Sequence, residues 1–551
     1  MKRKIGFLIL LLQASISLMG QSSYKIYYQA SYNGKPVQNQ DILIIGNEHE
    51  SLITTQKALD LTQKFPIQET IIDAQKGKIY NLARLSGNRQ IAITDSLSWQ
   101  KTSFDLSNET KKVAGYWCKK ASIVINSNHI DLWYTTELPV KGSPAIAGSP
   151  LGLVLEYSRN GNYVLTAIKV EKIKGTNKLN LAQRIQESDL VDNLTYNDLL
   201  WKSRYTTIPV FTQARLNFSD ETKSNDTLIS LRKGIAQIKK LRFPPLAQGD
   251  QVFLDVTQRS LGDAYDRTGT VFIVPASKVK LENGILSYIG EDTRLHNQAI
   301  ASDKYVPNIE LMRFFTSFGA GLDKPGGYQI KGKQWHKENF YRQEITDIAS
   351  LLSDQEIYVG IQIENYDKNG HLVDVNMTIH HDNESQAALP KVLSLFNTVD
   401  VLNPKGNELI DLFKSPEGLK MEFTIEKTLK NARIRFITTG HGGWGNGDEF
   451  LRKNNSLLLN GEKIFSIVPW REECGSYRMQ NPVSGNFSSG LSSSDLSRSN
   501  WCPGTITNPY YIDLGTILPG NYTLQLLIPQ GEDEGSSYSQ WNVSASLIGT
   551  E

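Results

Sequence analysis

The fold class is decided by an alternation of apolar residues, which is clearest in the stretch IYVGIQIE at residues 357–364. Every second residue from Ile357 to Ile363 is apolar and β-branched, which is the period of a strand with a buried face. The same period recurs at residues 432–436 and 541–545. Many short strands with few helices between them favour antiparallel sandwiches over a parallel α/β sheet. We therefore predict a mainly β fold.

The composition is that of a globular chain with several buried cores. Its 551 residues are 39% hydrophobic and 21% charged, which excludes fibrous and largely disordered classes and predicts three to four domains at about 150 residues each. Lys and Arg number 59 and Asp and Glu number 57, for a net charge of +2. A balance this even argues against nucleic acid as a partner.

The N-terminus is typical of a secretory signal peptide. Lys2, Arg3 and Lys4 precede the apolar run Ile5–Leu12, and small or polar residues then lead to residue 20. Removing residues 1–20 takes away three cations and no acid, which leaves a net charge of −1. No later segment reaches the roughly 20 apolar residues of a membrane span. We expect a secreted or periplasmic protein without a membrane partner.

The three cysteines suggest one disulfide. Cys474 and Cys502 lie close together in the sequence, whereas Cys118 stands alone. In an oxidising compartment such a pair indicates a disulfide rather than a metal site or a nucleophile. The bridge would stabilise the fold by roughly 3–4 kcal/mol in the chain-entropy model. Cys118 is expected to be a buried free thiol.

The residue composition and the spacing of apolar residues change along the chain. Residues 21–170 are short β-rich runs broken by Gly, Asn and Pro. Residues 171–204 are predicted to be a helical connector, since apolar residues from Leu179 to Trp201 recur at loosely helical spacing. From residue 205 to the end, short strands alternate with polar, Gly- and Ser-rich loops.

Ready-made catalytic motifs are absent from the sequence. It has no Gly-x-Ser-x-Gly, no His-Glu-x-x-His and no Gly-x-x-x-x-Gly-Lys-Ser/Thr. The glycine-rich stretch at residues 440–447 has no Lys to bind phosphate. His380 and His381 are the only adjacent histidines. Neighbouring strand residues point to opposite faces, so a shared metal is not expected and no cofactor is predicted.

Acidic and aromatic side chains instead gather in four loops, at residues 261–267, 364–366, 448–450 and 498–504. The first loop reads LGDAYDR and crowds two acids and an arginine into a short connection between strand-like runs. Each loop alone is typical of a solvated surface. Together the four are more specific.

In their order along the chain, these loops resemble the peptide:N-glycosidase F family. The resemblance covers about residues 205–551. The segments that carry it are the Asp-x-aromatic-Asp-Arg pattern at 263–267 with the β run to 274, and residues 309–314, 444–449, 501–504 and 511–513. It implies two packed antiparallel jelly-roll sandwiches, at 205–382 and 383–551, with a substrate cleft between them. It also implies an amidase that hydrolyses the bond between N-acetylglucosamine and a glycoprotein Asn, with N-linked glycoproteins and glycopeptides as partners.

The resemblance also implies the site residues. Asp266 matches the primary catalytic carboxylate, Glu449 the second and Glu364 the third. Positioned carboxylates can activate water and protonate an amine leaving group, so no Ser or Cys nucleophile is required. The residues expected to bind substrate are Asp263, Tyr265, Arg267, Tyr366, Trp444, Phe450, Arg498 and Trp501. Of the three disulfides that the family has, only the one matching Cys474 and Cys502 remains.

The N-terminal region resembles a different group, the GLPGLI family of secreted β-rich bacterial proteins. Residues 115–121, 132–139 and 148–154 carry the match. That family has no established chemistry, which indicates an accessory domain. The expected oligomeric state of the whole chain is a monomer.

Two other functions remain as alternatives. A non-catalytic glycan-binding double sandwich would keep the same residues without turnover. A copper monooxygenase on a similar fold would need a His-x-His pair and a Met ligand, for which only His380-His381 is suggestive.

Overall fold

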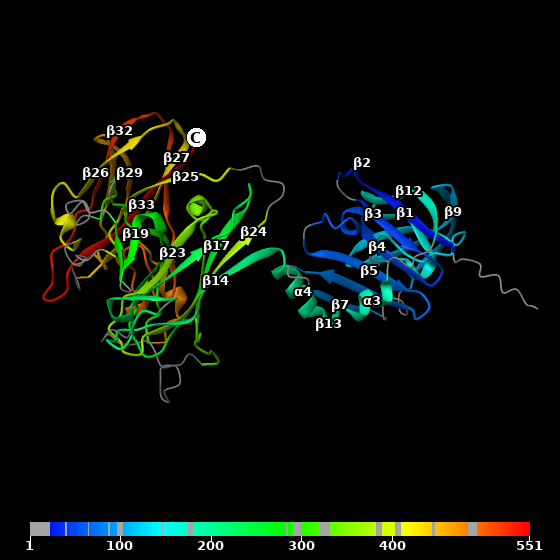
Figure 1. Ribbon diagram of the computed structural model, residues 1–551, viewed down its shortest axis with the longest axis horizontal. Coiled ribbons are helices and arrows are strands. Elements are labelled where there is room, and N and C mark those ends of the chain that lie inside the picture. The colour runs from blue at the N-terminus through cyan, green and yellow to red at the C-terminus, as the bar shows by residue number, and fades with distance from the viewer. Residues whose placement is uncertain are drawn as a thin grey trace, which may run out of the picture. The chain divides into compact units, whose positions relative to one another are not determined.

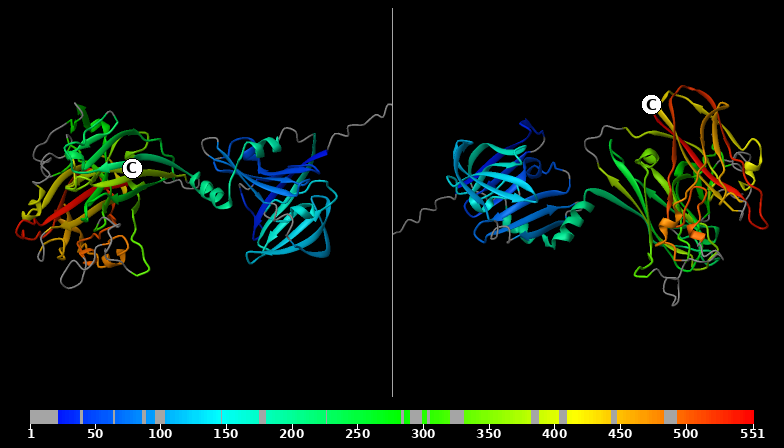
Figure 2. Two further views of the ribbon diagram at one scale, coloured as in Figure 1. Left: turned by 90° about the horizontal axis from the view of Figure 1, so that it is seen from below. Right: turned by 180° about the vertical axis from the view of Figure 1, so that it is seen from behind.

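The computed structural model describes residues 22–38, 41–63, 65–85, 89–95, 103–145, 147–174, 180–225, 227–282, 285–289, 299–302, 305–319, 331–381, 388–402, 409–442, 447–482 and 493–551. The chain divides into two compact units, residues 1–204 and 205–551. Both are built from β-sheets, which confirms the mainly β fold class (Figures 1 and 2). The predicted signal peptide lies outside the described residues. In the described part of the chain, no helix is long and apolar enough to cross a membrane.

The first unit is one 13-stranded sheet, in the order β13-β7-β6-β5-β4-β3-β1-β12-β11-β10-β9-β8, with β2 paired to β1. Its strands are β1 (Ser22–Tyr32), β2 (Lys35–Pro36), β3 (Ile42–Gly46), β4 (Glu50–Thr55), β5 (Ile67–Asp73), β6 (Lys78–Arg84), β7 (Gln90–Asp95), β8 (Asp105–Val113), β9 (Tyr116–Ile125), β10 (Asn128–Thr135), β11 (Leu153–Arg159), β12 (Tyr163–Lys174) and β13 (Asp189–Leu190). Its helices are α1 (Gln56–Leu59), η2 (Ser149–Leu151), α3 (Leu181–Gln186) and α4 (Asn193–Lys202).

Helices α3 and α4 pack on opposite faces of this sheet. Leu181 of α3 shares an apolar core with Leu82, whereas Tyr196 of α4 shares another with Ala83. Neighbouring residues of a strand point to opposite faces, so the two helices cover the two sides of strand β6. Both helices fall within the predicted connector at residues 171–204, and both pack on the first unit.

Cys118 of β9 is free and buried in the first unit, as predicted. It lies in an apolar cluster with Val113 and Leu155. Burial raises the pKa of its thiol to about 11, so Cys118 stays protonated and acts as a small apolar side chain.

The second unit begins with a pair of sheets around one core. A four-stranded sheet, β14-β24-β17-β22, faces a six-stranded sheet, β15-β16-β23-β18-β21-β30. The strands are β14 (Tyr205–Leu216), β15 (Ile229–Leu231), β16 (Ala236–Arg242), β17 (Gln251–Ser260), β18 (Thr268–Pro275), β21 (Ile309–Phe315), β22 (Asn339–Glu344), β23 (Glu356–Ile363), β24 (His371–His380) and β30 (Ile506–Thr507). The hairpin of β19 (Val279–Glu282) and β20 (Ile285–Tyr288) and the 3-10 turns η4 (Arg232–Gly234), η5 (Ala276–Lys278) and η6 (Thr346–Leu351) accompany them.

A second pair of sheets follows, β25-β33-β27-β31 and β26-β32-β28-β29, around a separate core. Its strands are β25 (Lys391–Asn397), β26 (Leu419–Ile425), β27 (Leu429–His441), β28 (Asn455–Leu459), β29 (Glu462–Ile467), β31 (Tyr510–Ile517), β32 (Gly520–Leu527) and β33 (Gln540–Thr550), with 3-10 turns η8 (Leu412–Lys414), η9 (Cys474–Tyr477) and η10 (Ser493–Asp495). The alternations at residues 357–363, 432–436 and 541–545 are confirmed as strands β23, β27 and β33.

Polar contacts join the two sandwiches of the second unit. Arg313 of β21 is fully buried, forms an ion pair with Glu310 at 2.7 Å and donates to the Asn542 carbonyl oxygen of β33 at 2.6 Å. Arg435 of β27 donates to the carbonyl oxygens of Glu310 and Leu311. Strand β30, which follows β29 in the chain, pairs with β21 of the first sandwich. These contacts fix β21 of the first sandwich against β27 and β33 of the second.

Candidate active site

The loop at residues 261–267 connects β17 to β18 and carries Asp266. Three backbone hydrogen bonds hold it: Leu261 N–H donates to Gly370 O at 2.8 Å, Gly319 N–H to Ala264 O at 2.7 Å, and Thr316 N–H to Arg267 O at 2.9 Å. Gly370 directly precedes β24, and Thr316 and Gly319 lie in the segment that follows β21. The loop is therefore fixed by packing between strands.

Asp263 is the buried anchor of this loop, with its side chain 2% exposed. Its carboxylate accepts from Arg267 Nε at 2.7 Å and Nη2 at 3.1 Å, and lies 3.3 Å from His371 Nε2. Burial alone would raise the pKa of Asp263, but the hydrogen bonds from His371 and Arg267 outweigh it and lower the pKa to about 2. Both oxygens are engaged, so Asp263 positions the loop and is not free to bind a substrate.

Asp266 and Glu449 meet at one guanidinium. Arg498 Nη2 lies 3.1 Å from Asp266 Oδ2, and Arg498 Nη1 donates to Glu449 Oε1. The side chain of Arg498 is 1% exposed, whereas those of Asp266 and Glu449 reach solvent in part. Arg498 also donates to the Ser493 carbonyl oxygen at 2.7 Å and to its hydroxyl at 3.1 Å. One buried cation thus brings together two carboxylates that are 183 residues apart in the chain.

Burial governs the protonation of this cluster. It raises the pKa of Asp266, and Arg498 offsets only part of that effect. It also lowers the pKa of Arg498, which Asp266 opposes. Asp266 Oδ2 is buried against Arg498 Nη2, and no hydrogen bond satisfies it within the described part of the chain. Asp266 is therefore a carboxyl paired with a buried cation, with an increased tendency to hold a proton.

Aromatic rings support Arg498 from beneath. Its guanidinium carbon lies 4.3 Å from the ring centroid of Trp501 and 5.0 Å from that of Phe450. Trp501 stacks on Phe315 at 4.4 Å and donates from Nε1 to Gly440 O at 3.0 Å. Trp501 is only 3% exposed, so the prediction that it offers an open face to a sugar does not fit its burial. It packs under the arginine.

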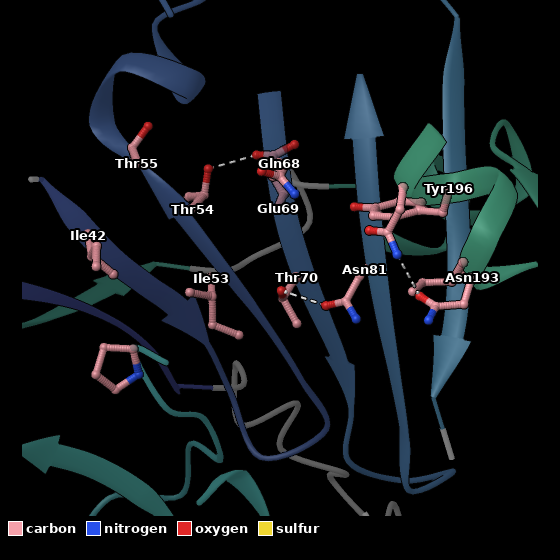
Figure 3. A pocket seen from close by; sticks show the side chains of 13 residues that line it. Ile42, Ile53, Thr54, Thr55, Gln68, Glu69, Thr70, Asn81, Asn193 and Tyr196 are labelled. Carbon is pink, nitrogen blue, oxygen red and sulfur yellow. Dashed lines mark hydrogen bonds between the residues drawn. The ribbon is translucent and has the colours of Figure 1, made fainter. Parts of the chain in front are cut away.

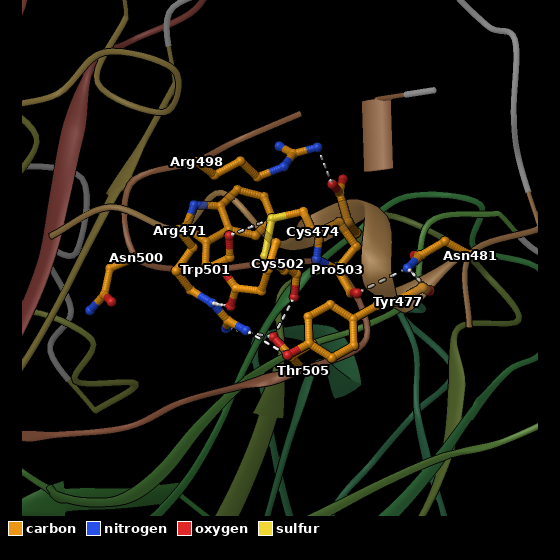
Figure 4. Close-up of a disulfide and its surroundings, with 12 residues drawn as sticks. Arg471, Cys474, Tyr477, Asn481, Arg498, Asn500, Trp501, Cys502, Pro503 and Thr505 are labelled. Carbon is orange, nitrogen blue, oxygen red and sulfur yellow. Dashed lines mark hydrogen bonds and ion pairs between the residues drawn. A yellow bond between two sulfur atoms is a disulfide. The ribbon is translucent and has the colours of Figure 1, made fainter. Parts of the chain in front are cut away.

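The predicted disulfide between Cys474 and Cys502 is present. It ties η9 to the residue that follows Trp501, and Figure 4 shows Trp501 and Arg498 beside it. Arg471 Nη1 donates to the Thr505 hydroxyl at 2.8 Å and to Ile506 O at 3.0 Å. The segment that carries Arg498 is thus held covalently and by hydrogen bonds.

Glu449 follows a buried acid that anchors its loop. Asp448 accepts from Trp541 Nε1 at 2.7 Å and from the Gly531 N–H at 2.9 Å. Ser499 donates from its hydroxyl to Asp448 O at 2.5 Å and from its N–H to Glu449 O at 3.0 Å. These bonds place Glu449 next to the Arg498 segment. Trp444, a predicted binding residue of the same loop, lies outside the described residues.

Glu364 stands at the end of β23, and its N–H donates to Thr268 O at 3.0 Å, beside the start of β18. Its side chain reaches solvent, yet the protein around it removes part of its hydration and raises its pKa, against the opposing charges of Arg232, Arg267 and Arg313. Gln362 Nε2 donates to its carboxylate at 3.2 Å. Glu364 is therefore a solvent-accessible carboxyl on the sheet that carries the Asp266 loop.

Tyr265 and Tyr366 are the exposed aromatic residues of the site, at 59% and 79% exposure. The Arg267 guanidinium carbon lies 5.0 Å from the ring centroid of Tyr265 and 5.7 Å from that of Tyr366. Asp263 fixes this arginine from the buried side. The two rings and the cation form one polar-edged apolar surface.

Sequence reasoning missed two buried histidines beside the site. His371 contacts Asp263 and also lies 2.9 Å from Gln258 Nε2 through Nδ1. His441 lies 2.7 Å from the Thr439 hydroxyl, and burial, with Arg313 and Arg498, lowers its pKa to about 3. It is therefore neutral at physiological pH. Neither stands in a recognisable motif, because their roles arise from strand register and packing.

The adjacent histidines His380 and His381 contact different partners. His380 stacks on Tyr205 at 4.7 Å, whereas His381 Nδ1 lies 3.0 Å from Asp250. Among the residues that the structure describes, no group of three or more His, Cys, Asp and Glu side chains could hold a metal ion.

Three family models match the chain. The model for the N-terminal domain of N-glycanase peptide matches residues 26–198, and those for the N-terminal and C-terminal parts of peptide-N-glycosidase F match residues 207–379 and 409–548. No curated protein sequence gives a significant match.

Solved structures of PNGF-II in two crystal forms are similar to this chain at 42% and 43% identity, with TM-scores of 0.81 and 0.82. The alignments cover 96% of this chain and 98% and 100% of those chains. PNGase F from Flavobacterium meningosepticum matches at 15% identity over 63% of this chain and 96% of its own, with a TM-score of 0.44. Identity above 40% over nearly the whole length establishes common descent. The chain therefore belongs to the peptide-N-glycosidase F family.

Proposed function

We propose that this chain is a secreted peptide-N4-(N-acetyl-β-glucosaminyl)asparagine amidase, which releases N-glycans from glycoproteins or glycopeptides. One observation carries the proposal. Asp266 and Glu449 come from different loops and both contact Arg498. The pKa of Asp266 is raised, so this carboxyl holds a proton more readily than an exposed one. Such a pair can supply an acid and a base to one bond.

The reaction hydrolyses the side-chain amide of a glycosylated Asn. Water adds to the amide carbon, the bond from that carbon to the glycosidic nitrogen breaks, and the nitrogen leaves with a proton as the glycosylamine. The peptide Asn becomes Asp, and the free glycosylamine later loses ammonia in water. Neither a protein nucleophile nor a redox partner enters this balance.

Asp266, Glu449 and Arg498 have different roles in this reaction. Asp266 faces the glycosidic nitrogen and the first sugar, and its raised pKa suits a carboxyl that shares a proton with the departing amine. Glu449 orients and deprotonates the attacking water on the peptide side. Arg498 holds both carboxylates and fixes the distance between them, which makes it the positioning residue of the pair.

Sugar contacts come from the exposed part of the site. Tyr265 and Tyr366 offer ring faces for the apolar side of a chitobiose core, and Arg267 lies between them for sugar hydroxyls. Glu364 holds further water and hydroxyl groups. Trp501 and Phe450 support Arg498 from below.

We also propose a domain organisation for the whole chain. The sandwiches at 205–382 and 383–551 are jelly rolls that flank the substrate cleft. The region at 21–170 is an accessory GLPGLI-like domain, residues 171–204 lead from it to the second unit with their helices packed on the first, and the signal peptide at 1–20 directs export. The disulfide suits an oxidising compartment.

The test is digestion of a defined N-glycopeptide in ¹⁸O-labelled water, followed by mass analysis of both products. We expect a free glycan and a peptide whose new Asp carries one labelled oxygen. A peptide that keeps one N-acetylglucosamine would mean cleavage between sugars and would overturn the proposal. Binding of the glycopeptide without any product would favour the glycan-binding alternative, and stoichiometric bound copper with oxidised product would favour the monooxygenase.

A further inference from the structure

We propose that the first unit carries a second binding site, a groove for an uncharged oligosaccharide on the face of its sheet. The groove has a volume of about 410 Å³, within the range of roughly 300–1,000 Å³ that small-ligand sites occupy. It is formed entirely by residues of the first unit, so it is separate from the residues proposed for hydrolysis. We call it the neutral groove.

The floor of the neutral groove is a row of side chains across four strands. Strand register pairs Ile53 with Thr70, Thr70 with Asn81, and Asn81 with Ile93. Residues opposite one another in neighbouring strands point to the same face, so the row runs isoleucine, threonine, asparagine, isoleucine. Figure 3 shows Ile53, Thr70 and Asn81 side by side on this floor. A polar centre is thus flanked by apolar ends.

The walls add amide side chains and a buried tyrosine. Asn193 and Asn197, one turn apart on α4, line the groove together with Tyr196. Ile42, Thr55, Gln68 and Pro144 also line the groove. Helix α4 is held there by its packing on Ala83 and Ile91 of the sheet, and by Asp192, which caps its first turn by accepting from Thr195 N–H at 3.0 Å. The walls therefore belong to the folded core of the unit.

The lining carries no available charge. Glu69 is the one acidic side chain among the described lining residues, and no Lys or Arg occurs among them. Thr54 donates to Glu69 Oε1 at 2.7 Å and Arg184 donates to Oε2 at 2.9 Å, with Arg84 Nη2 3.7 Å away. Glu69 neighbours Thr70 in β5, so its side chain points to the opposite face of the sheet, where α3 packs, and a charged ligand would find no counter-charge in the groove.

The polar atoms that remain suit hydroxyl and acetamido groups. The Thr70 hydroxyl donates to Asn81 Oδ1 at 3.0 Å, which orients the amide and leaves Asn81 Nδ2 as a donor toward the groove. Asn197 Nδ2 donates to Asn193 Oδ1 at 3.4 Å, which leaves Asn197 Oδ1 to accept. Donors and acceptors of this neutral kind, with isoleucines at both ends for the C–H faces of a sugar ring, match an uncharged oligosaccharide better than an ionic ligand.

The experiment titrates the full-length chain with free N,N′-diacetylchitobiose and follows backbone hydrogen exchange. We expect slower exchange in peptides that cover β5 and β6 when the disaccharide is added. The variant Thr70→Val/Asn81→Leu replaces both partners of one hydrogen bond with apolar groups of similar shape, which leaves stability nearly unchanged. It should lose the protection in β5 and β6 and weaken groove binding at least tenfold. Thr94→Val, on the opposite face of the same sheet, is the matched control and should behave as the parent chain.

The outcomes separate this site from the proposed active site. Hydrolysis of a short glycopeptide by the Thr70→Val/Asn81→Leu variant should equal that of the parent chain, and a chain without any amidase activity would still be tested by the exchange experiment. A fully deacetylated, cationic chitobiose or an acidic disaccharide should give no protection in β5 and β6. Protection by the charged sugars, or equal protection in the double variant, would overturn the proposal, as would the absence of any protection up to millimolar disaccharide.

Discussion

The two units present their polar side chains in opposite ways. In the second unit, Arg498 is buried with two carboxylates at its guanidinium, so charge is concentrated away from water. In the neutral groove of the first unit, the one acidic residue of the described lining, Glu69, turns its carboxylate to Arg184 on the opposite face, and the open positions are amides and hydroxyls. Breaking an amide needs proton transfer, and desolvated charge changes the proton affinities that drive it. Holding a neutral sugar needs only hydrogen bonds and apolar contact.

The same contrast appears within one loop. Asp263 and Asp266 are three residues apart, yet the pKa of Asp263 is lowered to about 2 while that of Asp266 is raised. Burial opposes ionisation of both, but only Asp263 receives hydrogen bonds from two side chains that overcome it. One acid therefore stabilises the loop, and the other is held in a setting that favours its protonated form.

The largest expected effect is loss of turnover in Asp266→Asn. Removal of a general acid lowers rates by about 10²–10⁴-fold, so glycopeptide hydrolysis by this variant should fall within that range. Glycopeptide binding should persist, since the surface formed by Tyr265, Tyr366 and Arg267 remains. The measurement is single-turnover kinetics with the parent chain as control, and unchanged turnover would remove Asp266 from the mechanism.

The same variant tests whether the raised pKa of Asp266 lowers the stability of the folded chain at neutral pH. A carboxyl whose folded pKa lies above its ordinary value of 3.8 favours folding fully below that pH and loses this contribution as the pH rises through the folded pKa. Asp266→Asn should therefore unfold at an equal or higher temperature than the parent chain at pH 7, with the difference closing toward pH 4. A clear loss of thermal stability at pH 7 would contradict the assignment.

Removal of the buried cation is the next largest perturbation. Arg498→Met removes the cation that Asp266 and Glu449 both contact, and breaking a buried ion pair in this way destabilises by about 3–5 kcal/mol. Urea unfolding at pH 7 should show that loss in the second unit. Arg498→Lys keeps the charge without the planar fork and should lose less. The exposed Arg259→Met is the matched control, and an equal effect there would mean that burial of Arg498 is unimportant.

Removal of the disulfide should destabilise the second unit and not the first. Its two cysteines are 28 residues apart, and closing a loop of that length is worth roughly 3–4 kcal/mol in the chain-entropy model. Cys474→Ala/Cys502→Ala should lower the unfolding transition of the second unit and leave that of the first unit in place. Cys118→Ala, the control, keeps the bridge. A joint shift of both transitions would show that the two units unfold together.

Sequence reasoning predicted what depends on local pattern. Alternation at residues 357–363 predicted β23 because one face of a strand must be apolar to reach a core. The spacing of Cys474 and Cys502 predicted their bridge. The order of loop motifs predicted that Asp266 and Glu449 belong to one site, and the shared Arg498 supports it.

What it could not predict depends on packing between distant strands. From its sequence position, Trp501 is expected to offer an exposed ring face. Its ring instead stacks on Phe315 and is buried, and no sequence pattern indicates that contact. His371 supports Asp263 only because β24 pairs with β17 in one register. The neutral groove could not be predicted for the same reason. Thr70 and Asn81 belong to no motif, and only the strand register places them side by side.

The smallest effect, and the sharpest test of the contrast within the loop, is Asp263→Asn. The pKa of Asp263 falls from 3.8 to about 2 in the folded chain, and at about 1.4 kcal/mol per unit this is worth about 2 kcal/mol of stability at neutral pH. Because the folded pKa is depressed, that stability is present above pH 3.8 and disappears as the pH falls through 2. The parent chain should therefore be more stable than the variant near pH 7, and the two should converge toward pH 2, whereas Asp266→Asn should be at least as stable as the parent at pH 7. A difference that stayed constant with pH would mean that the Asp263 carboxylate contributes its shape and not its charge, and the opposition between the two acids would fail.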